Sequence, residues 1–115
     1  MERQILTHVV QGDTLNEQLA IFAKDVPGKG GANHVYKIGD LTLEFQIGNP
    51  KAGVNGISDE ALLAIVIDRL KGFENGPFRE INTTSARVRC EQALKYLQKR
   101  TTERLSRGVL GEMKP

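Results

Sequence analysis

The chain has almost none of the cysteine that covalent or metal cross-links require. Its 115 residues include one cysteine, Cys90. Secreted domains of this size usually carry several paired cysteines, so a disulfide framework is excluded, and so is a cysteine-based zinc site. The N-terminal "MERQILTHVV" also lacks the shape of a signal peptide, because its short apolar stretch is broken by Thr7 and His8. Both absences predict an intracellular protein.

Long apolar runs are also missing. No apolar stretch comes near the roughly 20 residues that span a bilayer. The composition, with 39% hydrophobic and 26% charged residues, is ordinary for a soluble globular protein and unlike that of a disordered one. A chain of 115 residues has room for one modest core. We therefore expect a single domain over residues 1–115.

Catalytic and metal-binding patterns are absent as well. No nucleophile and base occur at a recognisable spacing, and His8 and His34 have no second ligand at metal-site spacing. The glycine-rich "GKGGANH" at 28–34 could cradle a phosphate, but it lacks the spacing of a nucleotide-hydrolysing loop and precedes an expected strand. A tight turn explains its glycines equally well. We predict no enzyme activity, no metal and no cofactor.

The first half of the sequence has the pattern of an antiparallel sheet. Runs rich in β-branched residues or alternating in polarity occur at 5–10, 18–24, 33–38 and 41–47. The connections are too short for crossover helices, so neighbouring strands should pair as hairpins. Residues 48–56 contain glycine, proline and asparagine and predict a loop. The expected β-sheet part is therefore 1–56.

The second half is typical of two helices. Ser58 is a suitable N-cap, and acidic residues follow it at the first turn of an expected four-turn helix. A second helix should begin near Asn82 to Thr84, giving an antiparallel hairpin over 57–108 and a tail at 109–115. The fold class is α+β, a small N-terminal antiparallel β-sheet followed by a C-terminal two-helix hairpin. The expected packing seam of the second helix is Ala86, Cys90, Ala93, Leu97 and Thr101.

The first of these helices is apolar around too much of its circumference. Its apolar residues are Leu62, Leu63, Ile65, Val66, Ile67, Leu70 and Phe73. They cannot all face one partner helix or one small sheet, and a helix that is apolar on several sides must be covered on several sides. In so short a chain the cover should be another subunit, which predicts a homo-oligomer.

Charge is distributed unevenly. Residues 1–75 carry seven basic and ten acidic side chains, whereas residues 76–115 carry nine basic and four acidic ones. Arg100, Arg104 and Arg107 recur at helical spacing, and such cations repel each other unless an anion neutralises them. A solvated basic face is the commoner explanation of such a row. The alternative is a phosphate ligand, which arginine binds well and beside which Phe73 or Tyr96 could stack on a base.

Two segments make the chain recognisable. "GVNGISDEALLAIVIDRLKGFENGPF" and "ALKYLQKRTTERLSRGVLG" resemble phage proteins of the Thoeris anti-defence sponge family, whose helical hairpin is shared with anti-CBASS cyclic-nucleotide sponges, and "PGKGGANHVYKI" resembles the β half of that group. The resemblance implies a phage-encoded protein in the cytoplasm of a bacterial host. It would sequester a cyclic ADP-ribose isomer made by TIR-domain enzymes, without cleaving it. Some members also bind cyclic di- and trinucleotides at separate pockets, and the members assemble as dimers or hexamers.

The same resemblance implies the ligand contacts. An aromatic residue at the end of the first helix corresponds to Phe73, and two arginines of the "KRTxxR" region correspond to Arg100 and Arg104. A polar contact near the start of the second helix corresponds to Asn82 when residue type is matched and to Thr83 when positions are counted from the C-terminal segment. The residues alone leave other functions open: a nucleic-acid-binding module, a helical oligomerisation module and a nucleotide-processing enzyme.

Overall fold

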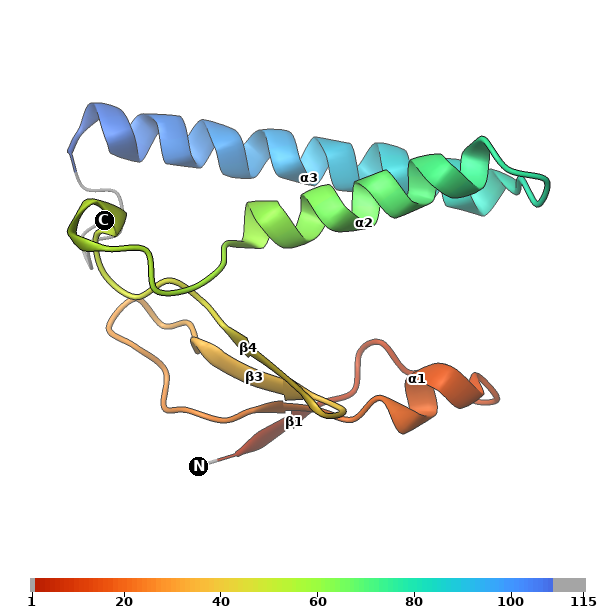
Figure 1. The fold of residues 1–115 in the computed structure, drawn as a ribbon, viewed down its shortest axis with the longest axis horizontal. Helices are drawn as coiled ribbons and strands as arrows, with labels where there is room; N and C mark the ends of the chain where they lie inside the picture. The colour runs from red at the N-terminus through yellow and green to blue at the C-terminus, as the bar shows by residue number, and fades with distance from the viewer. Residues whose placement is uncertain (1, 109–115) are drawn as a thin grey trace. The chain divides into compact units, whose positions relative to one another are not determined.

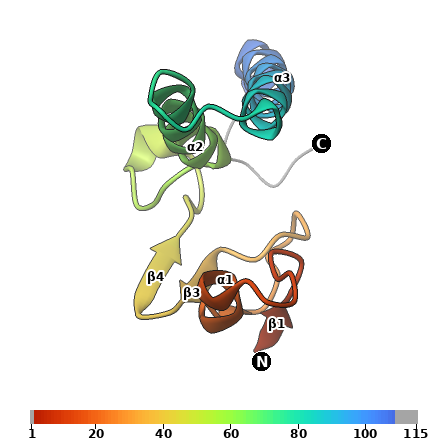
Figure 2. The same ribbon diagram turned by 90° about the vertical axis from the view of Figure 1, so that its right-hand side faces the viewer.

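The computed structural model describes residues 2–108, and these form two compact units that meet in the sequence between Ile57 and Ser58. The first unit is a sheet of four strands, and the second is a pair of helices (Figures 1 and 2). The expected α+β class, with the sheet before the helices, is confirmed. The expected tail at 109–115 lies outside the described residues.

The sheet has the order β1-β2-β3-β4, and each neighbouring pair is antiparallel. Its strands are β1 (Arg3–Ile5), β2 (Ile21–Ala23), β3 (Val35–Ile38) and β4 (Leu41–Glu44). The pairing places Ile5, Ile21, Ile38 and Leu41 in one row across the sheet. Because residues two apart in a strand share a face, the next row, which includes the fully buried Ala23, lies on the same face. This face is the apolar side of the sheet unit.

The first expected strand was wrong. Residues 5–10 were predicted as a strand, but β1 ends at Ile5, and turns lead to a short helix, α1 (Thr14–Gln18), that the sequence pattern did not indicate. The Asp13 carboxylate caps α1 by accepting a hydrogen bond from the amide of Asn16 at 3.3 Å. That local cap favours a helical turn before the chain returns as β2.

The glycine-rich segment before β3 is a closed turn. The amide of Gly28 donates to the carbonyl of Ala32 at 2.9 Å, and Gly31 has a φ of 98°. The Asp25 carboxylate accepts hydrogen bonds from the amides of His34 and Val35, at 3.0 and 3.2 Å. Burial alone would raise the pKa of Asp25, but these hydrogen bonds and one from Asn33 lower it. The geometry supports the turn interpretation of the glycines.

The predicted loop at 48–56 contains one short 3-10 helix, η1 (Pro50–Ala52), which Asn49 caps by accepting from the amide of Lys51 at 2.9 Å. Beyond it the chain returns to the end of β4, where Phe45 and Ile57 form an isolated bridge.

The helical unit is an antiparallel hairpin of α2 (Asp59–Glu74) and α3 (Ile81–Ser106). The predicted cap of α2 is confirmed, because the hydroxyl of Ser58 accepts from the amide of Ala61 at 3.0 Å. The predicted start of α3 was wrong: α3 begins at Ile81, and Glu80 precedes it without a side-chain cap. Thr84, one of the expected caps, instead donates its hydroxyl to Glu74 of α2 at 3.1 Å.

The seam between the helices has a spacing of three and four residues on both sides. The inward positions of α2 are Glu60, Leu63, Ile67, Leu70 and Glu74, and those of α3 are Thr83, Arg87, Cys90, Leu94, Leu97 and Thr101. The expected seam is correct at Cys90, Leu97 and Thr101 and wrong at Ala86 and Ala93, which are exposed. The reason is that a polar pair at each end fixes which stripe of α3 faces α2.

These polar pairs close the two ends of the hairpin. At the end nearest the connecting loop, Arg87 binds Glu74 through two nitrogens and Glu91 through the third, at 2.6 Å to Glu91. Hydrogen bonding to Arg87 lowers the pKa of Glu74, and hydrogen bonding to Glu74 raises that of Arg87. At the other end, the hydroxyl of Thr101 donates to Glu60 at 2.9 Å.

Candidate ligand-binding site

Phe73 lies in the last turn of α2 and is accessible. It is 51% exposed, although an apolar ring on a helix would ordinarily be covered. The guanidinium carbon of Arg69, one turn earlier on the same helix, lies 5.6 Å from the centre of the ring. The ring therefore carries a cation beside one face and remains open to a further stacking partner.

The two candidates for the polar contact differ in exposure. Asn82 is exposed in the first turn of α3, whereas Thr83 is half-buried and occupies the seam. The amide of Thr83 donates to the carbonyl of Glu80 at 3.1 Å, as part of the first turn. The side chain of Asn82 is thus the more accessible of the two.

The two candidate arginines also differ. Arg100 is exposed, and no ion pair to it occurs within residues 2–108. Arg104 is only 9% exposed and already interacts with other groups. The sequence predicts that both arginines belong to one ligand-binding row. In the structure Arg100 lies on the surface and Arg104 is buried.

The expectation of an unneutralised arginine row is wrong for Arg107. This residue forms an ion pair with Glu103 at 3.4 Å. Glu103 lies four residues earlier on the same helix, where side chains meet on one face. Arg100 is the exposed member of the row that forms no ion pair within residues 2–108.

Phe73 and Arg100 lie at opposite ends of the hairpin. Phe73 adjoins the Glu74–Arg87 pair, and Arg100 adjoins the Thr101–Glu60 contact. Thirteen residues separate Glu60 from Phe73, and a helix rises about 1.5 Å per residue, so the two ends are about 20 Å apart. One chain cannot bring both residues to the same small ligand.

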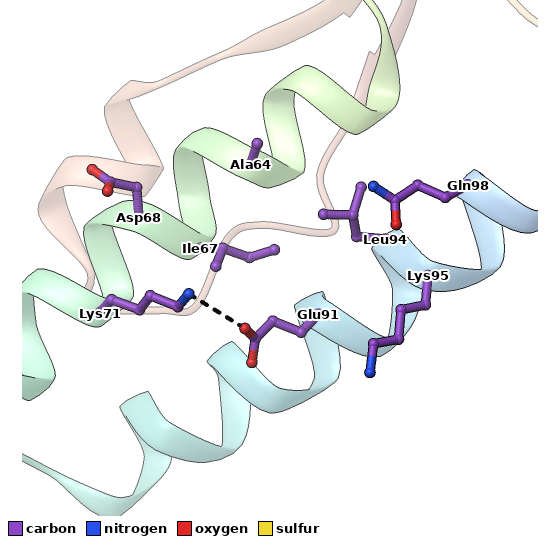
Figure 3. Close-up of a pocket in the computed structure, with 8 residues that line it drawn as sticks. All are labelled: Ala64, Ile67, Asp68, Lys71, Glu91, Leu94, Lys95 and Gln98. Carbon is purple, nitrogen blue, oxygen red and sulfur yellow. Dashed lines mark ion pairs between the residues drawn. The ribbon is translucent and has the colours of Figure 1, made fainter. Parts of the chain in front are cut away.

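A groove lies between the two helices, on a side of the hairpin that does not include Phe73 or Arg100 (Figure 3). Its volume is about 340 Å³, and its lining residues are Ala64, Ile67, Asp68, Lys71, Glu91, Leu94, Lys95 and Gln98. Lys71 and Glu91 form an ion pair across it at 3.6 Å. Phe73 and Arg100 are each two residues from a lining residue, which is more than half a helical turn, so both point away from the groove. Its two acidic and two basic side chains do not favour an anion.

Phe73 and Arg100 therefore share the side of the hairpin opposite the groove. Asn82 lies on the same side, because it is nine residues, or about two and a half helical turns, before the lining residue Glu91. Ile65 and Val66 of α2 are 58% and 43% exposed. Both belong to the apolar residues of this helix that were expected to be covered by another subunit. Sequence reasoning missed Arg69 at this site. The signal was present, because Arg69 and Phe73 are four residues apart on one helix, the spacing at which a cation and a ring can meet.

Within residues 2–108, no three His, Cys, Asp or Glu side chains gather where a metal ion could bind. The described helices also include none that is both long and apolar enough to cross a membrane.

Comparison with known proteins identifies a protein of similar sequence. No family model matches the chain. A curated protein of Bacillus phage SBSphiJ7, named Thoeris anti-defense 1, is 39% identical over 90 residues, which cover 73% of this chain and 63% of the relative. The chain thus spans slightly less than two thirds of that relative's length. With this identity over most of its sequence, the chain belongs to the Thoeris anti-defence family.

Proposed function

We propose that the protein counteracts Thoeris defence by sequestering its nucleotide signal, a cyclic ADP-ribose isomer, without cleaving it. The relative's name supports an anti-Thoeris role. The family resemblance of the sequence supplies the ligand class and a phage-encoded protein that acts in the cytoplasm of the bacterial host. Binding of cyclic di- and trinucleotides at a second pocket, and assembly into a hexamer, stay predictions from that resemblance.

The observation that carries the proposal is the placement of Phe73 and Arg100. Both are exposed on one side of the hairpin, yet they lie at opposite ends. If two hairpins meet antiparallel on this side, Phe73 of one subunit approaches Arg100 of the other. Such an arrangement would also cover Ile65 and Val66 of α2. We therefore propose a homo-oligomer with composite sites, each built from two subunits.

In each site the ring of Phe73 would stack on the base, and Arg100 would donate charge-assisted hydrogen bonds to the pyrophosphate. Asn82, rather than Thr83, is the preferred polar contact, because the side chain of Asn82 is exposed. Arg104 would contribute either by binding the phosphate directly or by holding the last turns of α3 in place. Both roles are compatible with its low exposure of 9%.

Mixing two defective variants tests the composite site. Phe73→Ala and Arg100→Glu should each abolish binding of cyclic ADP-ribose isomer, because each removes one half of every site. After the two proteins exchange subunits, mixed dimers regain one intact site, so about a quarter of the sites should bind again. If both residues act within one chain, the mixture recovers nothing. Lys99→Glu, at an exposed neighbouring position, is the control and should bind normally.

Oligomeric state provides a separate test. Light scattering coupled to size exclusion should show a dimer or a higher even-numbered assembly. A monodisperse monomer at micromolar concentration would remove the basis for a site between subunits.

Three rival functions make different predictions. A nucleic-acid-binding module would lose affinity steeply with salt, whereas a pocket for one dianion should lose much less. An enzyme would consume the ligand beyond one equivalent per site, whereas sequestration predicts full recovery of intact nucleotide after heat denaturation. A purely oligomerising module would bind neither ligand.

A further inference from the structure

Arg69 contacts Phe73 but is not among the ligand-binding residues proposed above. The guanidinium lies 5.6 Å from the ring centre, within the range of a cation–π interaction. Both side chains are exposed. Within residues 2–108, no carboxylate pairs with Arg69, and its guanidinium lies over the aromatic ring.

This contact has two consequences for the ring. A guanidinium on one side restricts the rotation of Phe73 about its side-chain bonds, so less conformational entropy remains to be lost when a ligand binds. It also covers only one of the two faces of the ring, which leaves the other face available. The half-exposure of Phe73, at 51%, agrees with one covered and one open face.

We propose that Arg69 is a positioning residue for a planar anionic ligand, holding Phe73 so that the open face of its ring can stack on a nucleobase. This inference rests on the proposed function, because it takes Phe73 as the stacking residue. It goes beyond that function by placing a cation at the Phe73 end of the hairpin, about 20 Å from Arg100 within one chain.

A double-mutant cycle tests the inference, with cyclic ADP-ribose isomer as the probe and calorimetry as the assay. Arg69→Gln should weaken binding about two- to fivefold, the equivalent of an exposed cation–π contact. The Phe73→Leu background keeps an apolar contact, so its binding should be weak but measurable, unlike that of Phe73→Ala. In that background the same change should have no further effect, because Arg69 acts through the ring. Arg69→Lys, which keeps the cation, should restore part of the loss. An equal loss in both backgrounds, or no loss in either, would overturn the proposal.

Arg79→Gln is the matched control, since Arg79 is an exposed arginine in the connection between the helices. It should leave affinity unchanged. A loss as large as that of Arg69→Gln would indicate a general effect of positive charge and contradict a positioning role.

A measurement without ligand separates this inference from the proposed function. Nuclear magnetic resonance of the free protein should show the Arg69 Nε proton shifted upfield by the ring, and Phe73→Leu should abolish the shift. If the wild-type protein binds no cyclic ADP-ribose isomer, the proposed function fails, and a ligand role for Arg69 fails with it. If binding is strong but the shift is absent, only the positioning role is overturned.

Discussion

Gly56 is the position at which a single methyl group should damage the sheet unit most. It lies just before Ile57, where the chain returns to the end of β4. A Cβ at this position would lie 2.5 Å from the carbonyl carbon of Phe45 and 2.6 Å from both the amide nitrogen of Gln46 and the carbonyl oxygen of Glu44. All three are backbone atoms, so no side chain can rotate away to make room.

The loss of folding stability caused by Gly56→Ala follows from these distances. Carbon atoms pack at about 3.5–4.0 Å, so Gly56→Ala forces the two segments apart by about 1 Å. That movement breaks the hydrogen bonds from Gln46 to Ile57 and from Ile57 to Glu44, now 3.0 and 2.9 Å long. Overpacking costs about 1–3 kcal/mol and each lost hydrogen bond about 0.5–1.5 kcal/mol. Because these costs overlap, we expect a loss of about 3 kcal/mol.

Thermal unfolding and hydrogen exchange measure this loss. The Tm should fall by about 10 °C or more, and the amides of Gln46 and Ile57 should lose protection. Gly72→Ala is the control, because Gly72 lies in α2 with nothing within 4 Å of an added Cβ. It should stabilise the helix by about 0.5–1 kcal/mol. If Gly56→Ala leaves the Tm and both amides unchanged, the steric argument is refuted.

The remaining predictions concern the hairpin. The pKa of Glu74 is lowered from 4.5, so its pairing with Arg87 stabilises the hairpin above that value, and the stability is lost as the pH falls through the lower folded pKa; Glu74→Gln should flatten the difference in Tm measured between pH 6 and pH 3. Asn82→Ala should weaken ligand binding with little change in Tm, whereas Thr83→Ala should mainly alter Tm; the reverse pattern would identify Thr83 as the contact. Arg104→Glu should destabilise the fold by about 1–3 kcal/mol or more, because it removes the interactions of a buried cation; an unchanged Tm in calorimetry would contradict a structural role for this side chain. Arg100 is therefore the better residue for a binding test.

Sequence by itself determined the order and kind of the main elements. Alternating polarity marks β3 and β4, and the helical period with the Ser58 cap marks α2, because each signal depends on neighbours within a few residues. The same local information placed Phe73 and Arg100 on the hairpin. It missed α1, since a helix of five residues has too short a pattern to show a period.

Only the tertiary structure decided which stripe of α3 faces α2. Neighbouring stripes differ by one residue, as Ala93 and Leu94 do, and the helical period fits both. The choice is made by contacts between residues far apart in sequence, Arg87 with Glu74 and Thr101 with Glu60. In the folded protein Arg104 is buried and Arg100 lies on the surface, although four residues of α3 turn only slightly more than one full helical turn, so the sequence pattern alone does not distinguish them.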